Sequence, residues 1–103
     1  MEKERDSKEY ASKYITATEL LSKSACELVK LIPLAGGNIG DLRVYDGEDA
    51  NGELKLRVRI PANSSRPFVF NPHVYLRRGL YIVFTEQIDG CFAQWRPRPS
   101  KEG

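Results

Sequence analysis

The chain is poor in the residues that most often carry chemistry. Its 103 residues include one histidine, one tryptophan and two cysteines. Cys26 and Cys91 are too far apart for the Cys-x-x-Cys spacing of metal and redox sites. Because each lies in an apolar, strand-like segment, we expect two buried free thiols rather than a disulfide between neighbouring strands.

Long apolar runs and an excess of one charge are also missing. No run approaches the about 18 residues that a membrane span needs. The first residues, MEKERDSKEY, mix acids with bases and precede no apolar segment, so we expect no signal peptide and no membrane contact. Sixteen Lys and Arg against 14 Asp and Glu give a net charge of +2, which is too balanced to imply nucleic acid from charge alone.

The signal that is present is an alternation of apolar and polar residues. Residues 53–60 (ELKLRVRI) alternate strictly, and 41–45 (DLRVY) do so over a shorter span, as half-buried strands do. Residues 79–85 (GLYIVFT) form an apolar run typical of a central strand, and 90–95 (GCFAQW) predict the last strand. The predicted core is Leu42, Val44, Leu54, Leu56, Val58, Ile60, Leu80, Ile82 and Phe84.

The remaining segments are shorter or ambiguous. Two short strands are expected at 67–70 and 73–76, separated by the turn pair Asn71-Pro72. Residues 18–32 partly fit a helix, but a strand at about 25–32 is favoured because turn residues and another strand follow. Many short strands with Gly, Pro and Asn turns predict an all-β, antiparallel sandwich or barrel.

We expect three regions along the chain. Residues 1–13 are a charged flexible arm or short helix, 14–95 a single β domain, and 96–103 a Pro-rich basic tail.

The acidic stretch VYDGEDANGELKLRVRI could be a calcium loop or a turn between strands. With Gly52 at the sixth position of an EF-hand loop, the first position is Gly47 and the twelfth is Val58, and neither can bind through a side chain. A looser calcium site from acids within 46–49 stays open. The plainer interpretation is that Asp46-Gly47 and Asn51-Gly52 supply turn geometry, so we expect no metal site.

Catalytic patterns are weak. The chain has no Gly-x-Ser-x-Gly motif, and Gly36-Gly37 with Gly40 do not complete a phosphate-binding loop. A pair of Cys91 with His73 would need a thiol activated by its surroundings, whereas Cys91 lies within a strand pattern. We therefore predict a protein that is not an enzyme and holds no cofactor.

A basic stripe on residues 53–60 is the main candidate for binding. Lys55, Arg57 and Arg59 share one face of the predicted strand, and the stripe could be extended by Arg77, Arg78, Arg96 and Arg98. Small β-barrels bind single-stranded nucleic acid with a basic groove and stacked aromatic rings. Most of the aromatic residues here lie in apolar strands, where filling the core is the commoner role, so nucleic acid is the alternative partner.

The chain resembles a known family in the order of two tripeptides and in the aliphatic strand that precedes them. Tyr45-Asp46-Gly47 follows one strand and Gly79-Leu80-Tyr81 opens a late one. In this respect residues 22–95 resemble a small all-β module of tailed-bacteriophage virion proteins, of the capsid-decoration or head-fibre type. The chain departs from that pattern in its charged arm, its basic tail and its more highly charged strand at 53–60.

The resemblance implies a β-sandwich or jelly-roll-like module without enzymatic activity. It implies a structural protein of the virion, made in the host cytoplasm, that forms a homo-oligomer and binds a capsid or other virion protein. The residues that we expect to bind a partner are Lys55, Arg57, Arg59, Tyr81, Trp95, Arg96 and Arg98, with Trp95 or Tyr81 as the anchor.

Overall fold

The computed structural model describes residues 10–98, and every regular element in this range is a strand. The strands are β1 (Ala11–Ile15), β2 (Glu19–Ser22), β3 (Cys26–Ala35), β4 (Gly40–Asp46), β5 (Glu53–Ile60), β6 (Phe68–Leu76), β7 (Leu80–Glu86) and β8 (Ile88–Pro97).

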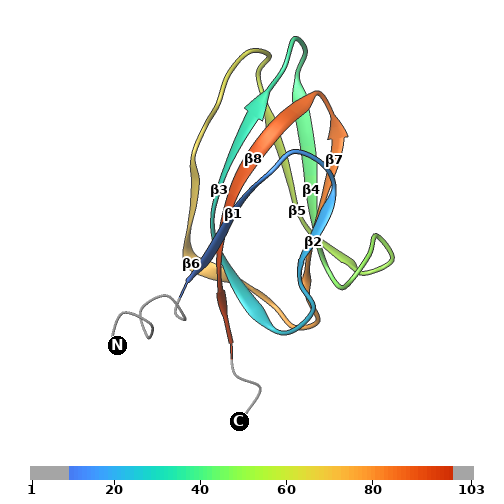
Figure 1. Ribbon diagram of the computed structural model, residues 1–103, viewed down its shortest axis with the longest axis vertical. Coiled ribbons are helices and arrows are strands. Elements are labelled where there is room, and N and C mark those ends of the chain that lie inside the picture. The colour runs from blue at the N-terminus through green and yellow to red at the C-terminus, as the bar shows by residue number, and fades with distance from the viewer. Residues whose placement is uncertain (1–9, 99–103) are drawn as a thin grey trace.

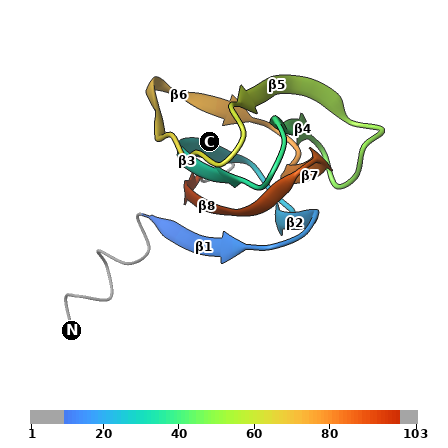
Figure 2. The same ribbon diagram turned by 90° about the horizontal axis from the view of Figure 1, so that it is seen from above.

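The strands form two antiparallel sheets that pack face to face (Figures 1 and 2). Sheet 1 has the order β1-β8-β3-β6, and sheet 2 has the order β2-β7-β4-β5. The antiparallel pairs β4–β5, β3–β6, β2–β7 and β1–β8 are nested in the sequence, as if one long hairpin had been rolled into two sheets. This is the jelly roll, and it confirms the predicted all-β sandwich.

The core lies between the sheets, where the alternating apolar side chains meet. Six of the predicted core residues are buried: Leu42, Val44, Val58, Ile60, Leu80 and Ile82. Cys26 and Cys91 are also buried and unbonded to each other, as predicted. Burial raises the pKa of Cys26 to about 11 and that of Cys91 to about 12, because a thiolate is poorly stabilised away from water.

Three predicted core residues are less buried. Leu56 and Phe84 are half-buried, and Leu54 is 48 % exposed. Val44 pairs with Leu56 but the next residue, Tyr45, pairs with Leu54, so β5 carries one extra residue at this point. Such a bulge shifts the alternation by one position and turns Leu54 to the outer face.

The favoured strand within 18–32 is present as the first part of β3, which begins at Cys26. The two predicted strands at 67–70 and 73–76 are instead one strand, β6, so that expectation was wrong. β6 ends sheet 1, and its register against β3 shifts between Val69 and Val74, around Pro72. A proline, which has no N–H, is tolerated at such an irregularity in an edge strand.

Part of the predicted arm and part of the predicted tail belong to strands of the β domain. Residues 11–13 belong to β1 and pair with β8, and β8 continues to Pro97. Ala11 lies opposite Trp95, which gives the start of β1 an apolar partner that its own sequence does not reveal. The rest of both predicted regions, 1–9 and 99–103, lies outside the described residues.

Candidate interaction surface

The two tripeptides that carry the resemblance meet in space. Tyr45 and Asp46 of β4 pair with Tyr81 and Leu80 of β7, and the N–H of Gly47 donates to the carbonyl oxygen of Gly79 over 3.3 Å. The two tripeptides therefore form a single structural unit at the end of β4. The chain leaves β4 there through residues 47–52, which we define as the acidic turn.

Asp46 holds this unit together. The residue is 5 % exposed, and its carboxylate accepts hydrogen bonds from the backbone N–H groups of Arg77, over 3.1 Å, and of Arg78, over 2.7 Å. Both donors lie in the connection between β6 and β7, so Asp46 fastens that connection to the end of β4. A carboxylate that accepts backbone N–H bonds in this way serves the fold.

The acidic turn itself is built by local hydrogen bonds, as predicted for a turn. The N–H of Asn51 donates to a side-chain oxygen of Asp49 over 2.9 Å, and the N–H of Gly52 donates to the Asp49 carbonyl over 3.1 Å. Glu48 and Asp49 are exposed. Over residues 10–98 no group of three or more metal-binding side chains is found. Both ribbon views show the turn projecting from the molecule on the side of sheet 2 that faces away from sheet 1 (Figures 1 and 2).

The outer face of sheet 2 is the surface from which this turn projects. Its side chains form three rows of cross-strand partners. The charged row is Glu86–Asp41–Arg59, the arginine row is Val83–Arg43–Arg57, and the aromatic row is Leu20–Tyr81–Tyr45–Leu54. The aromatic row crosses all four strands and lies next to the acidic turn.

The arginine row is only partly neutralised. The guanidinium of Arg57 donates two hydrogen bonds of 3.3 and 3.4 Å to the carboxylate of Asp41, which is 3 % exposed. Arg43 lies directly opposite Arg57, and its Nε is buried without a hydrogen-bond partner. Like charges in directly opposed positions repel, and a buried donor without an acceptor costs free energy. The row therefore has unused capacity to bind an anion.

The aromatic row supplies apolar area beside these charges. The rings of Tyr45 and Tyr81 lie 6.5 Å apart at an interplanar angle of 54°, and both side chains are half-buried. Tyr and Arg, together with Trp, are the residues most enriched at the centres of protein interfaces. The face thus combines two residue types that are typical of binding surfaces.

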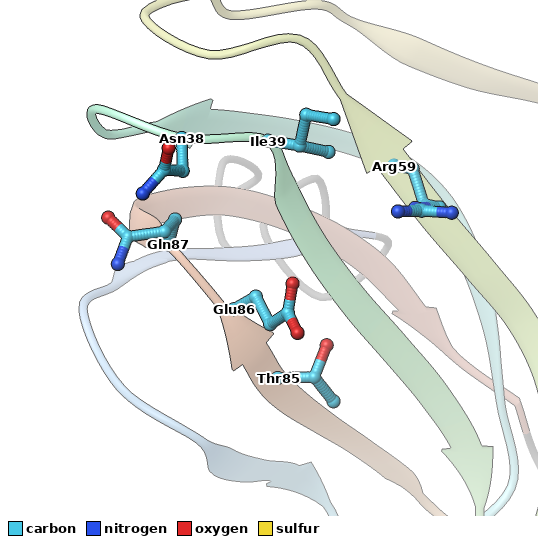
Figure 3. Close-up of a pocket in the computed structure, with 6 residues that line it drawn as sticks. All are labelled: Asn38, Ile39, Arg59, Thr85, Glu86 and Gln87. Atoms are coloured by element: carbon cyan, nitrogen blue, oxygen red, sulfur yellow. The ribbon is translucent and has the colours of Figure 1, made fainter.

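A shallow pocket lies at the other end of the face, around the charged row (Figure 3). Figure 3 shows Arg59 on β5 and Glu86 on β7 to either side of β4, and both residues pair with Asp41. The pocket is lined by Asn38, Ile39, Arg59, Thr85, Glu86 and Gln87. This lining offers amides, a hydroxyl and one charge of each sign, which suits contact with a polar partner.

The predicted binding residues are not all brought together. Arg57, Arg59 and Tyr81 lie on the outer face of sheet 2. Lys55 is the extra residue of the β5 bulge, with its ammonium 3.7 Å from the carboxylate of Glu53. Trp95 is 8 % exposed and packs in the core, so it is no surface anchor.

Arg96 lies on β8 of sheet 1, and Arg98 follows the end of that strand. Arg96 lies over the ring of Tyr10, 5.9 Å from its centroid, and Arg98 lies 4.7 Å from the centroid of Tyr75. Arg98 also donates to the carboxylate of Glu27 over 2.8 Å. These residues do not extend the basic stripe of β5.

Four residues of the outer face were not among the predicted binding residues: Leu20, Arg43, Tyr45 and Leu54. The alternation of Arg43 and Tyr45 with buried Leu42 and Val44 was a signal for the outward position of Arg43 and Tyr45. Leu20 and Leu54 could be found only from the strand register, since each is apolar and lies next to a bulge.

The Cys91 and His73 pair has the wrong surroundings for nucleophilic catalysis. His73 Nδ1 lies 3.2 Å from the carboxylate of Glu27, on sheet 1. The pKa of Cys91 is raised by burial, whereas a nucleophilic thiol needs a lowered one.

The chain matches no family model and no curated protein. Among solved structures it is similar to the coat protein of Tobacco streak virus, with 13 % identity and a TM-score of 0.39 over 90 % of this chain and 83 % of that one. At this level of similarity nothing about function transfers to the chain. Among residues 10–98, no helix is long and apolar enough to cross a membrane.

Proposed function

We propose that the protein is a non-enzymatic structural protein of a virus particle, which binds a shell protein or another virion protein through the outer face of sheet 2. The observation that supports this most is the strand order of the two sheets, because it is the jelly roll that viral capsid domains use. The more specific role, inferred from the sequence resemblance, is that of a capsid-decoration subunit of a tailed bacteriophage.

Jelly rolls also serve as lectins and as cupins. Lectins bind sugars through their loops, and cupins bind ligands inside the barrel. Here the space between the sheets is filled by apolar side chains such as Leu28, Leu31 and Trp95. The polar and aromatic groups instead lie on the outer face of sheet 2. A flat face of this kind fits a macromolecular partner better than a small ligand.

The test is whether the protein belongs to a particle. Virus particles from a culture that expresses the chain are purified on a density gradient, and the bands are analysed by mass spectrometry and by immunogold electron microscopy. We expect the protein to band with the particles and to be labelled on their surface. Recovery only in the soluble fractions would contradict the proposal.

Single-stranded nucleic acid is the second candidate, favoured by the adjacent arginine and aromatic rows. Against it, Arg57 is already engaged by Asp41, and the tyrosine rings are half-buried rather than free to stack. A nucleic-acid site predicts oligonucleotide binding that weakens steeply as salt rises. Replacement of Arg57 and Arg59 by Ser should then reduce binding, and unchanged binding would remove this candidate.

A further inference from the structure

We propose that two copies of the chain pair through the outer faces of their second sheets, about a twofold axis that passes beside Tyr45. The inference rests on the proposed binding role of this face, and it names a second copy as the partner. It comes from two features of the same sheet that complement each other: the arginine row and the projecting acidic turn.

The position of the axis follows from the spacing of charged residues before and after Tyr45. Arg43 lies two residues before Tyr45, whereas Glu48 and Asp49 lie three and four residues after it. A twofold axis that runs along the aromatic row, perpendicular to β4 and between the two faces, brings positions after Tyr45 in one copy over positions before it in the other. The acidic turn of each copy then lies over the arginine and charged rows of its partner, beside Arg43 and Arg59.

The direction of the turn makes this contact attainable. In both ribbon views residues 47–52 leave the plane of sheet 2 on its outer side (Figures 1 and 2). A second sheet laid on this face is therefore met by exposed carboxylates. Since a twofold interface uses one patch twice, both junctions of acidic turn and arginine row form at once.

The charges of the face are those that such a partner would satisfy. Asp41 is already bonded to Arg57, and among the described residues the side chain of Arg43 takes part in no hydrogen bond or ion pair. A carboxylate of Glu48 or Asp49 from the second copy gives Arg43 a counter-ion and relieves its repulsion with Arg57. Hydrogen bonds to a charged group are stronger than those between neutral groups.

The aromatic row supplies the apolar centre of the same interface. Leu54 is 48 % exposed, and Tyr45, Tyr81 and Leu20 are half-buried, so the row still has apolar area to lose to a partner. Around the axis each row packs against its own symmetry copy. An apolar centre with charged contacts at its edge is the usual anatomy of a protein interface.

The experiment reverses the charges on each side of the junction separately, in the full-length protein. One variant carries Arg43→Glu, and the other carries Glu48→Lys with Asp49→Lys. Masses are measured by light scattering after size exclusion, and dissociation constants by sedimentation over a roughly hundredfold range of concentration. Circular dichroism confirms that each variant is folded, with Arg43→Gln as a milder replacement.

The wild type is expected to dimerise, and each variant alone to dissociate at least about tenfold more readily, because both of its junctions become repulsive. An equimolar mixture of the two variants should restore a heterodimer, since each of its junctions then joins opposite charges. Matched reversals at exposed sites away from the face, Arg66→Glu and Asp89→Lys, should leave the dissociation constant unchanged.

Three results would overturn the inference. They are a monomer at every concentration, a dimer that is indifferent to both reversals, and a mixture that does not recover. A monomer that binds a single-stranded oligonucleotide and loses it on Arg43→Glu would assign the face to nucleic acid instead. The proposed virion role is tested separately by banding with particles, so a monomeric protein that still bands would refute the dimer alone.

Discussion

Replacement of Asp46 tests whether its carboxylate is an anchor of the fold or part of a metal loop. Its two hydrogen bonds to the backbone of Arg77 and Arg78 are charge-assisted, and each such bond contributes roughly 1.5–3 kcal/mol. Asp46→Ala removes both and leaves two backbone N–H groups without an acceptor. We expect the free energy of unfolding to fall by about 3–4 kcal/mol, a large part of the roughly 5–15 kcal/mol of a small domain.

Asp46→Asn separates the two bonds. The amide oxygen can accept one N–H, but the amide nitrogen is itself a donor and faces the other N–H. The expected loss is therefore smaller, about 1–2 kcal/mol. Unfolding in urea is followed through the fluorescence of Trp95, which is buried and is the single tryptophan of the chain.

Asp49→Ala is the matched control, because Asp49 lies three residues after Asp46, in the acidic turn, but is exposed. Its loss should be within about 1 kcal/mol. The reasoning is refuted if Asp46→Asn is as stable as the wild type, or if Asp49→Ala costs as much as Asp46→Ala. A rise of the wild-type urea midpoint on addition of calcium would bring back the metal interpretation.

Three further predictions concern the core. Trp95→Ala should lower the free energy of unfolding by about 3–5 kcal/mol, measured by circular dichroism in urea, and a loss of assembly without a loss of stability would contradict its place in the core. Gly79→Ala should cost roughly 1–3 kcal/mol, because the new Cβ would lie 2.7 Å from two backbone carbonyl oxygens; an unchanged melting temperature would show that the backbone adapts. The pKa values of Cys26 and Cys91 are raised in the folded protein to about 11 and about 12, so folding favours the protonated thiols. The stability that this preference adds to the folded state is complete below about pH 9. It should be lost as the pH rises from about 9 towards the folded pKa, by at most about 1.4 kcal/mol per pH unit for each thiol, and Cys26→Ala should unfold with a correspondingly shallower alkaline dependence.

The strands and much of the core could be predicted because a half-buried strand shows its burial directly in the sequence. Residues 53–60 alternate, and Val58 and Ile60 are buried accordingly. The same alternation runs through Cys91, Ala93 and Trp95, all of which are buried, so the core position of Trp95 could also have been predicted.

What could not be predicted depends on register. Leu54 follows the alternation of its own strand, but the bulge at Lys55 turns it outward. The alternation of apolar and polar residues cannot reveal an extra residue, because the bulge is defined only by the pairing of β5 with β4. The aromatic row has the same origin, because it exists only where four strands from distant parts of the sequence align.

Asp46 and the acidic turn that follows it allow the role in folding and the proposed role in binding to be tested separately. Asp46 is buried and bonded to the β6–β7 connection, whereas Glu48 and Asp49 are exposed at the projecting end. Loss of the first carboxylate should therefore lower the free energy of unfolding, and reversal of the other two should weaken association while leaving the free energy of unfolding of the monomer nearly constant. If both changes instead affected stability and association in the same proportion, the turn would act as one unit, and the separation of anchor from docking element would fail.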